Sequence, residues 1–179
     1  MTPPAPDPSA ALEACYRAAE QRMQGLPVVH PRLHVQAVGF RRWEGYWLGV
    51  VVTPWCMNLT LTPGERERWQ PLAAGVKRRL RFPAGDYEFI GAHDPAFGEY
   101  QICSLFSPME RFADQAAAAL VARLALEALL DPANAEPAEP ADTPPAAEPA
   151  AEVPDRSKRD FLRGRLGAAR GAAPADDPA

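Results

Sequence analysis

Proline is concentrated at the two ends of this 179-residue chain. Thirteen of its 21 prolines lie outside residues 9–130, four of them in residues 1–8 and nine in residues 131–179. Because proline lacks a backbone N–H and fixes φ, dense proline is incompatible with helix interiors and sheet centres. The residues between these ends are enough for one domain that buries roughly two-thirds of its surface. We therefore predict one folded domain at residues 9–130, preceded by a disordered N-terminus at residues 1–8.

The residues after position 130 divide into two segments of opposite charge. Residues 131–155 contain seven acids, seven prolines, eight alanines and no base, whereas residues 156–179 contain six bases and three acids. Such an acidic, proline-rich composition cannot bury a core, so we predict a disordered linker at residues 131–156. Arginine and large apolar residues return in the segment that follows. A basic-hydrophobic motif and tail at residues 157–179, on a disordered tether, has the form of a presented ligand.

Composition excludes several classes of protein. No stretch approaches the ~20 apolar residues of a membrane span, and the first residues lack the pattern of an export signal. The near-neutral domain lacks the basic surface that nucleic-acid binding needs. Three cysteines without a CxxC pair do not predict a disulfide scaffold or zinc ribbon. We expect a cytoplasmic protein with no membrane insertion and no nucleic-acid partner.

The folded region begins with a predicted helix and continues into strands. An apolar stripe from Leu12 to Met23 predicts a helix that starts at Asp7 or Ser9. The β-branched run of residues 46–53, between Gly45 and Pro54, predicts a strand buried on both faces. Further predicted strands cover residues 33–40, 57–62, 76–82, 86–91 and 99–106, and residues 65–75 are predicted as a short helix.

The last predicted helix starts at an apparent capping box. Ser107 precedes Pro108 and lies three residues before Glu110, and an apolar series from Phe112 to Leu124 follows. The whole pattern predicts an α+β fold: an antiparallel β-sheet meander flanked by an N-terminal and a C-terminal helix, with a disordered tail. We expect both helices on the same face of the sheet.

The sequence contains no catalytic motif, so we predict no enzyme activity, no catalytic residues and no cofactor. A metal- or cluster-handling site made of His34, Cys56 and Cys103 is a weaker alternative, because no pair of these residues has the spacing of metal ligands. We therefore predict no metal ligands.

Aromatic residues and carboxylates supply the candidate partner-binding residues. Trp43, Trp47 and Trp55 belong to a dense aromatic region, and an apolar sheet face left open would bind protein. Whether these tryptophans form such a face or only pack in the core stays open at this point. Asp86 and Glu88 alternate on one strand, and Glu99 lies on the next.

Four segments resemble the HybE/HupJ family of [NiFe]-hydrogenase assembly chaperones. These are residues 38–45, 53–59, 82–89 and 103–109, in that order, together with a C-terminal Arg-Asp-Phe-Leu-Arg-Gly. The resemblance implies an accessory chaperone for maturation of an uptake hydrogenase. Its partners would be a precursor subunit, the small subunit being favoured, with other maturation proteins as further candidates. The resemblance further implies that the chaperone holds the precursor back until its clusters are inserted, and that the complete protein is then exported by the twin-arginine route.

The tail motif is similar to the signal of that export route, which reads approximately S-R-R-x-F-L-K. Its residues are Ser157, Lys158, Arg159, Phe161, Leu162 and Arg163, with Asp160 at the variable position. No apolar segment follows the motif, so we interpret it as a mimic of a bound signal and not as an export signal. A signal is cationic, so Asp86, Glu88 and Glu99 beside an exposed aromatic are the predicted groove.

Two further hypotheses stay open. In one, the chain is a cytosolic adaptor that docks to the export machinery through its C-terminal motif. In the other, it handles a metal or cluster through cysteine and histidine.

The first testable prediction concerns the tail. Truncation after Asp131 should leave the thermal midpoint unchanged within error, because the acidic, proline-rich linker buries no apolar surface. Thermal unfolding followed by circular dichroism measures this. A drop of several degrees, the effect of ~1 kcal/mol, would mean that the tail packs on the domain.

Overall fold

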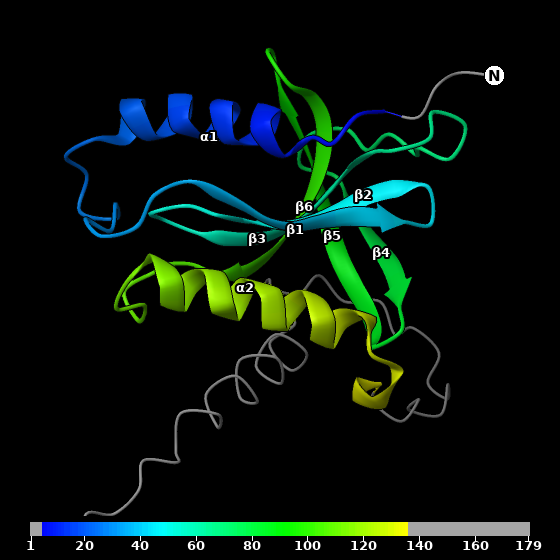
Figure 1. Ribbon diagram of the computed structural model, residues 1–179. Helices are drawn as coiled ribbons and strands as arrows, with labels where there is room; N and C mark the ends of the chain where they lie inside the picture. The colour runs from blue at the N-terminus through cyan, green and yellow to red at the C-terminus, as the bar shows by residue number, and fades with distance from the viewer. Residues whose placement is uncertain (1–4, 136–179) are drawn as a thin grey trace, which may run out of the picture.

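The computed structural model describes residues 5–135 of the chain (Figure 1). Its elements, in chain order, are helix α1 (Ser9–Met23), strands β1 (Gln36–Trp43), β2 (Tyr46–Val52), β3 (Met57–Pro63), β4 (Lys77–Phe82), β5 (Gly85–Asp94) and β6 (Gly98–Phe106), helix α2 (Gln115–Leu130) and a short 3-10 helix (Pro132–Asn134). The predicted linker beyond residue 135 and the tail motif lie outside the described residues.

The six strands form one antiparallel sheet in the order β1-β2-β3-β6-β5-β4. It consists of two three-stranded meanders, and the pairing of β3 with β6 joins them at the centre. The predicted α+β fold, with an antiparallel sheet and two flanking helices, is confirmed. The β3–β6 pair joins residues about 45 positions apart, which local sequence patterns do not predict.

The two helices cover opposite faces of the sheet, so the prediction of one shared face is wrong (Figure 1). Val51 of β2 packs with Leu12 and Tyr16 of α1. Its neighbours Val50 and Val52 face the other way, into the larger core that includes α2. All three valines have no exposed surface. Because successive side chains of a strand point to opposite faces, a strand that is apolar throughout needs cover on both sides.

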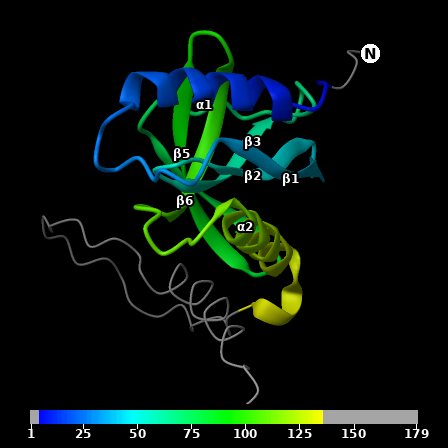
Figure 2. The ribbon, with the colours of Figure 1, turned by 60° about the vertical axis from the view of Figure 1, so that its left-hand side comes forward.

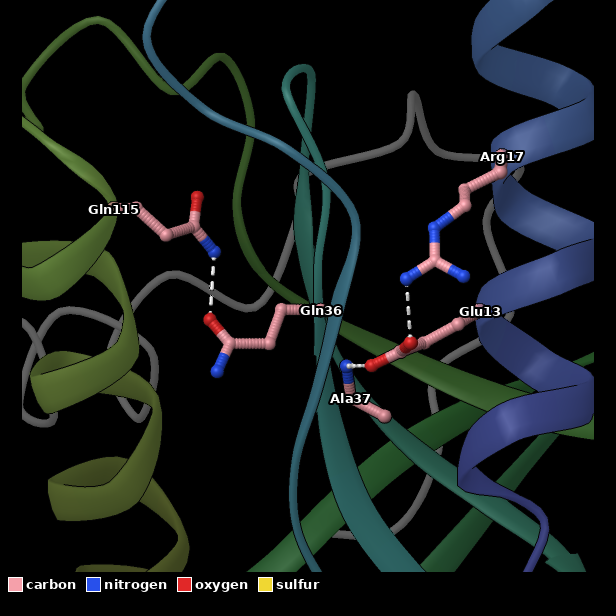
Figure 3. Close-up of polar contacts among 5 residues, drawn as sticks. All are labelled: Glu13, Arg17, Gln36, Ala37 and Gln115. Atoms are coloured by element: carbon pink, nitrogen blue, oxygen red, sulfur yellow. Dashed lines mark hydrogen bonds and ion pairs between the residues drawn. The ribbon is translucent and has the colours of Figure 1, made fainter.

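Edge strand β1 is held from both sides by polar groups of the helices (Figure 3). The Ala37 amide donates to Oε1 of Glu13 on α1 at 2.9 Å, and Arg17 fixes the same carboxylate at 2.7 Å. On the other side, Gln115 of α2 donates to the side-chain oxygen of Gln36 at 2.8 Å. Edge strands expose unpaired backbone groups that promote aggregation. Here Glu13 of α1 satisfies one of these groups, and side chains of both helices fix the strand between them.

The predicted short helix at residues 65–75 is absent and a covering segment occupies its place. Its hydrogen bonds are turns, such as those from the Arg68 and Trp69 amides to the Glu65 carbonyl. Trp69 packs against the main core. The backbone of Leu72 and Ala73 crosses so close to Gly91 that a Cβ there would meet two carbonyl oxygens at 2.3 Å. The segment therefore crosses β5 at Gly91 as an extended loop.

Helix α2 begins at Gln115, eight residues after the predicted capping box at Ser107. Asp114 is the N-cap, and its carboxylate accepts the Ala117 amide at 2.8 Å. The segment before it is a loop whose Met109 and Phe112 are buried. Burial of these two side chains outweighs the local helix signal, because core packing contributes more than one cap.

The buried face of α2 also differs from the predicted one. It consists mainly of alanines, with Leu126 and Leu129, whereas Leu120 is 50 % exposed. Alanine lets a helix approach a sheet closely, and Gly39 lies where α2 comes nearest: a Cβ there would sit 2.9 Å from Leu126. Neither of the described helices is long and apolar enough to cross a bilayer.

A pair of variants tests the observed helix start. Asp114→Ala should lower the free energy of unfolding by ~1 kcal/mol, since it removes the N-cap acceptor. That corresponds to roughly 3–5 °C in the thermal midpoint. Ser107→Ala should change it by less than ~0.5 kcal/mol, because Ser107 is exposed and caps no helix. If Ser107→Ala lowered the thermal midpoint more than Asp114→Ala does, the helix would start at Ser107.

Candidate functional site: a cleft beside the N-terminal helix

A cleft of about 760 Å³ lies between α1 and the β5–β6 hairpin. The hairpin reaches past the helix (Figures 1 and 2). We call this cleft the α1–hairpin cleft. Its volume lies within the range of ligand-binding clefts. Four parts of the chain line it: the N-terminal segment (Ala5, Pro6, Asp7, Pro8), α1 (Ala11, Ala14, Cys15, Ala18, Arg22), the end of β3 (Thr62, Pro63) and the hairpin (Asp94, Pro95, Ala96, Phe97, Glu99).

The α1 wall of the cleft is made of small side chains. Ala11, Ala14 and Ala18 recur at helical spacing and are exposed. Leu12 and Tyr16 are buried on the side of the helix that packs on the sheet. Alanine is the strongest helix former, so this wall is stable without large side chains. The space that larger residues would fill is left open.

The N-terminal segment closes one end of the cleft. The Ala5 amide donates to the Gly64 carbonyl at 2.9 Å. The Ala5 carbonyl accepts from Trp47 Nε1 at 3.0 Å and from the Arg42 guanidinium at 3.1 Å. Residues 5–8 therefore differ from the predicted disordered N-terminus. The reason is tertiary: the sheet supplies the hydrogen-bond partners that this proline-rich segment lacks within itself.

Asp94 shapes the hairpin wall. Its Oδ1 accepts the amides of Ala96 and Phe97 at 2.8 and 3.1 Å, which fixes the turn between β5 and β6. These backbone bonds, led by the one from Ala96 and supported by the Cys15 thiol, hold the pKa of Asp94 below its usual value. Asp94 is therefore anionic at neutral pH.

The cleft is acidic and contains an unsatisfied hydroxyl. Asp7, Asp94 and Glu99 line it with Arg22 as the single base, which gives the lining a formal charge of −2. Thr62 is 1 % exposed, and its Oγ1 has no hydrogen-bond partner among the described residues. A buried hydroxyl without a partner costs about 1–3 kcal/mol. The carboxylates of the lining thus suit a ligand that carries positive charge.

Cys15 lies on the α1 wall as a neutral thiol. Desolvation is the main cause that raises its pKa from 9.0 to about 11, and its hydrogen bond to Asp94 adds to the effect. A thiol with this pKa is protonated at neutral pH and is a poor nucleophile or metal ligand. Cys15 therefore contributes to the shape and polarity of the cleft.

The three predicted partner-binding tryptophans lie apart and are half-buried. Trp43 stacks on Phe82 at 4.3 Å and packs against the core that includes α2. Trp55 packs against the smaller core beneath α1. Trp47 anchors the N-terminal segment and lies under the Arg42 guanidinium, 4.7 Å from the ring centroid. They do not form one open aromatic face.

The predicted acidic groove is also divided. Asp86 pairs with Arg81 at 3.1 Å and Glu88 with Lys77 at 3.2 Å, so basic neighbours compensate both charges. Glu99 pairs with His93 in the β5–β6 register, five residues along β5 from Glu88, or about 16 Å. Of the three predicted carboxylates, only Glu99 lies in the cleft, where it also accepts from Trp69 Nε1 at 3.3 Å.

The residues of the alternative metal site lie on different parts of the fold. Cys103 is buried in the core that includes α2. The Cys56 thiol contacts the Thr53 hydroxyl at 3.3 Å and accepts from Asn58 at 3.4 Å, and burial raises its pKa. His34 is exposed before β1. Within residues 5–135 no three His, Cys, Asp or Glu side chains gather as metal ligands would.

Sequence reasoning missed the alanine face, Asp94 and Thr62. The Asp94-Pro95 pair is a turn signal that marks the hairpin. The alanines at positions 11, 14 and 18 share a helical face, which the sequence shows. That this face stands opposite the hairpin depends on tertiary structure. The tail motif, from Ser157 to Arg163, lies outside the described residues.

Three comparisons identify the relatives of this chain. The family model described as "[NiFe]-hydrogenase assembly, chaperone, HybE" matches residues 7–164. The hydrogenase expression/formation protein HupJ of Bradyrhizobium diazoefficiens is 40 % identical over 183 residues, which cover 96 % of this chain and all of that protein. The protein HoxT of Cupriavidus necator is 41 % identical over 166 residues, 86 % of each chain. The solution structure of HybE from Escherichia coli matches with a TM-score of 0.58 at 25 % identity, covering 88 % of this chain and 98 % of that one.

These matches place the protein in the class of hydrogenase accessory proteins. The chain belongs to the HybE family of [NiFe]-hydrogenase assembly chaperones. The resemblance of the four sequence segments to this family is thereby confirmed.

The Cys15–Asp94 contact gives a prediction for the cleft. Asp94→Asn should lower the pKa of Cys15 from about 11, because it removes a negative charge and a carboxylate acceptor beside the thiol. The pKa should stay above 9.0, since desolvation remains. The pH dependence of alkylation, resolved by peptide mass spectrometry, measures it, with Cys56 as the internal control. An unchanged Cys15 profile would mean that the thiol and Asp94 do not meet.

Proposed function

We propose that this protein binds the precursor of a [NiFe]-hydrogenase small subunit in the cytoplasm, before export, and that the α1–hairpin cleft receives the cationic segment of its twin-arginine signal. The protein acts by binding and not by catalysis. Membership of the assembly-chaperone family supports the hydrogenase as client. The observation that carries the site is the cleft itself, an acidic groove with a wall of alanines.

Charge complementarity supports a cationic ligand. The lining carries three carboxylates and one guanidinium. Opposite potentials accelerate association and select against acidic partners. The apolar surface of Phe97 and the alanines would take the large apolar residues that follow the arginines of a signal.

The client would be held reversibly. Asp7, Asp94 and Glu99 border open solvent, where salt screens their attraction over ~10 Å at 0.1 M. Exposed ion pairs contribute little each, so the affinity is expected to be moderate and sensitive to salt. A chaperone that must release its client needs such binding.

Ala14→Arg tests the cleft as the binding site. Ala14 is an exposed position on the α1 wall, so arginine keeps the helix but places a cation opposite the arriving arginines. The affinity for a purified small-subunit precursor should fall at least tenfold, the effect of about 1.4 kcal/mol. Biolayer interferometry measures it, with precursor that carries or lacks its signal.

Ala116→Arg is the matched control. Ala116 is an exposed alanine of α2, on the opposite face of the sheet, and should bind precursor as the wild type does. Equal binding by Ala14→Arg and wild type, or equal binding of precursor without its signal, would contradict the proposal. Capture of export-machinery components in place of the precursor would favour the adaptor hypothesis.

A further inference from the structure

We propose that the α1–hairpin cleft is occupied, in the free protein, by residues 157–166 of the same chain. The inference rests on the proposed function only in using the same cleft. It adds regulation: the segment is an internal competitor that a client must displace. Observations on the cleft, on the segment and on the residues that connect them carry it.

The cleft has the properties of a site that lacks its ligand. Its lining has a formal charge of −2, its α1 wall is built from exposed alanines, and Phe97 offers an apolar contact. The Thr62 hydroxyl is buried without a partner among residues 5–135.

The segment has matching chemistry. Residues 157–166 contain four bases and one acid, hence a formal charge of +3, and three large apolar residues, Phe161, Leu162 and Leu166. It is the only part of the sequence beyond residue 135 that combines these properties, since Phe161 is the single aromatic residue there. The match to the family model ends at residue 164 and so reaches into this segment.

Residues 136–156, which connect the folded part to the segment, are long enough for the segment to reach the cleft, and they carry negative charge. Residues 136–156 number 21, which as a flexible coil span roughly 25 Å, and more when like charges extend them. The radius of gyration of the folded part is ~14 Å, so the segment reaches either face. Six of these 21 residues are acidic and one is basic. The acidic cleft therefore rejects the linker and accepts the segment.

Because the segment is tethered, even weak binding is enough for it to occupy the cleft. A short flexible tether gives an effective concentration near millimolar. A segment with an intrinsic dissociation constant of about 0.1 mM would then occupy the cleft about nine-tenths of the time and weaken a competing client about tenfold. Because a ligand that binds only the folded state stabilises it, this occupancy replaces the neutral truncation expected from composition alone: truncation after Asp131 should then lower the thermal midpoint by several degrees.

Amide chemical shifts of the ¹⁵N-labelled full-length protein test the inference. Deletion of residues 157–166 should shift the amides of Ala11, Ala14, Ala18, Thr62 and Phe97 and leave those of α2 in place. The charge-reversed variant Arg159→Glu/Arg163→Glu should give the same shifts. Deletion of residues 167–176, also ten residues, is the matched control and should change none of these amides.

A synthetic peptide of residues 157–166, added to the deletion variant, should return the cleft amides to their full-length positions. The full-length shifts should not depend on protein concentration between 0.05 and 0.5 mM. Unchanged cleft amides on deletion, or changes confined to another face, would overturn the inference. Concentration-dependent shifts would also overturn it, since the segment would then bind a second copy.

The results separate this inference from the proposed function. If the deletion shifts the cleft amides but Ala14→Arg leaves precursor binding intact, the segment occupies the cleft and the client binds elsewhere. If the amides do not shift while Ala14→Arg abolishes precursor binding, the inference fails and the proposed function stands.

Discussion

The fold depends on the burial of β2 on both of its faces. Val50, Val51 and Val52 have no exposed surface, although their side chains alternate between the two sides of the sheet. A fully buried Val side chain contributes roughly 1.5–3 kcal/mol relative to an exposed one, so neither side can stay open to water. One helix must therefore lie on each face. Because the chain supplies one helix before the sheet and one after it, α1 and α2 take opposite sides.

The cleft forms because α1 covers its face of the sheet with few buried residues. Only Leu12 and Tyr16 of α1 are buried, and they cover β2 at Val51. The alanine face of the same helix is turned to the β5–β6 hairpin, and the N-terminal segment is fixed across one end through Ala5. α2, by contrast, buries six residues. The face that stabilises the fold less is the one available for a ligand.

Local patterns predicted the strands well and the contacts between elements poorly. The predicted strand at residues 46–53 matches β2 (Tyr46–Val52) because its β-branched run is a local signal. The capping box at Ser107 failed because Met109 and Phe112 are buried, which no local pattern reveals. The predicted acidic groove and the predicted aromatic face were wrong for a related reason. Alternation along a strand gives the side of the sheet on which each residue lies, but it does not give which strands are neighbours. The tail motif is a local sequence pattern whose role stays a prediction.

The most direct test of the α1–hairpin cleft as the client site is a crosslinking experiment that locates where a client contacts the protein. A photo-crosslinking amino acid at Ala18, on the cleft wall, or at Ala116, on the opposite face, can be introduced into the full chain in cells that make the hydrogenase. The α1–hairpin cleft as client site predicts a crosslink from position 18 to the small-subunit precursor and none from position 116. A precursor crosslink from position 116 alone would contradict it.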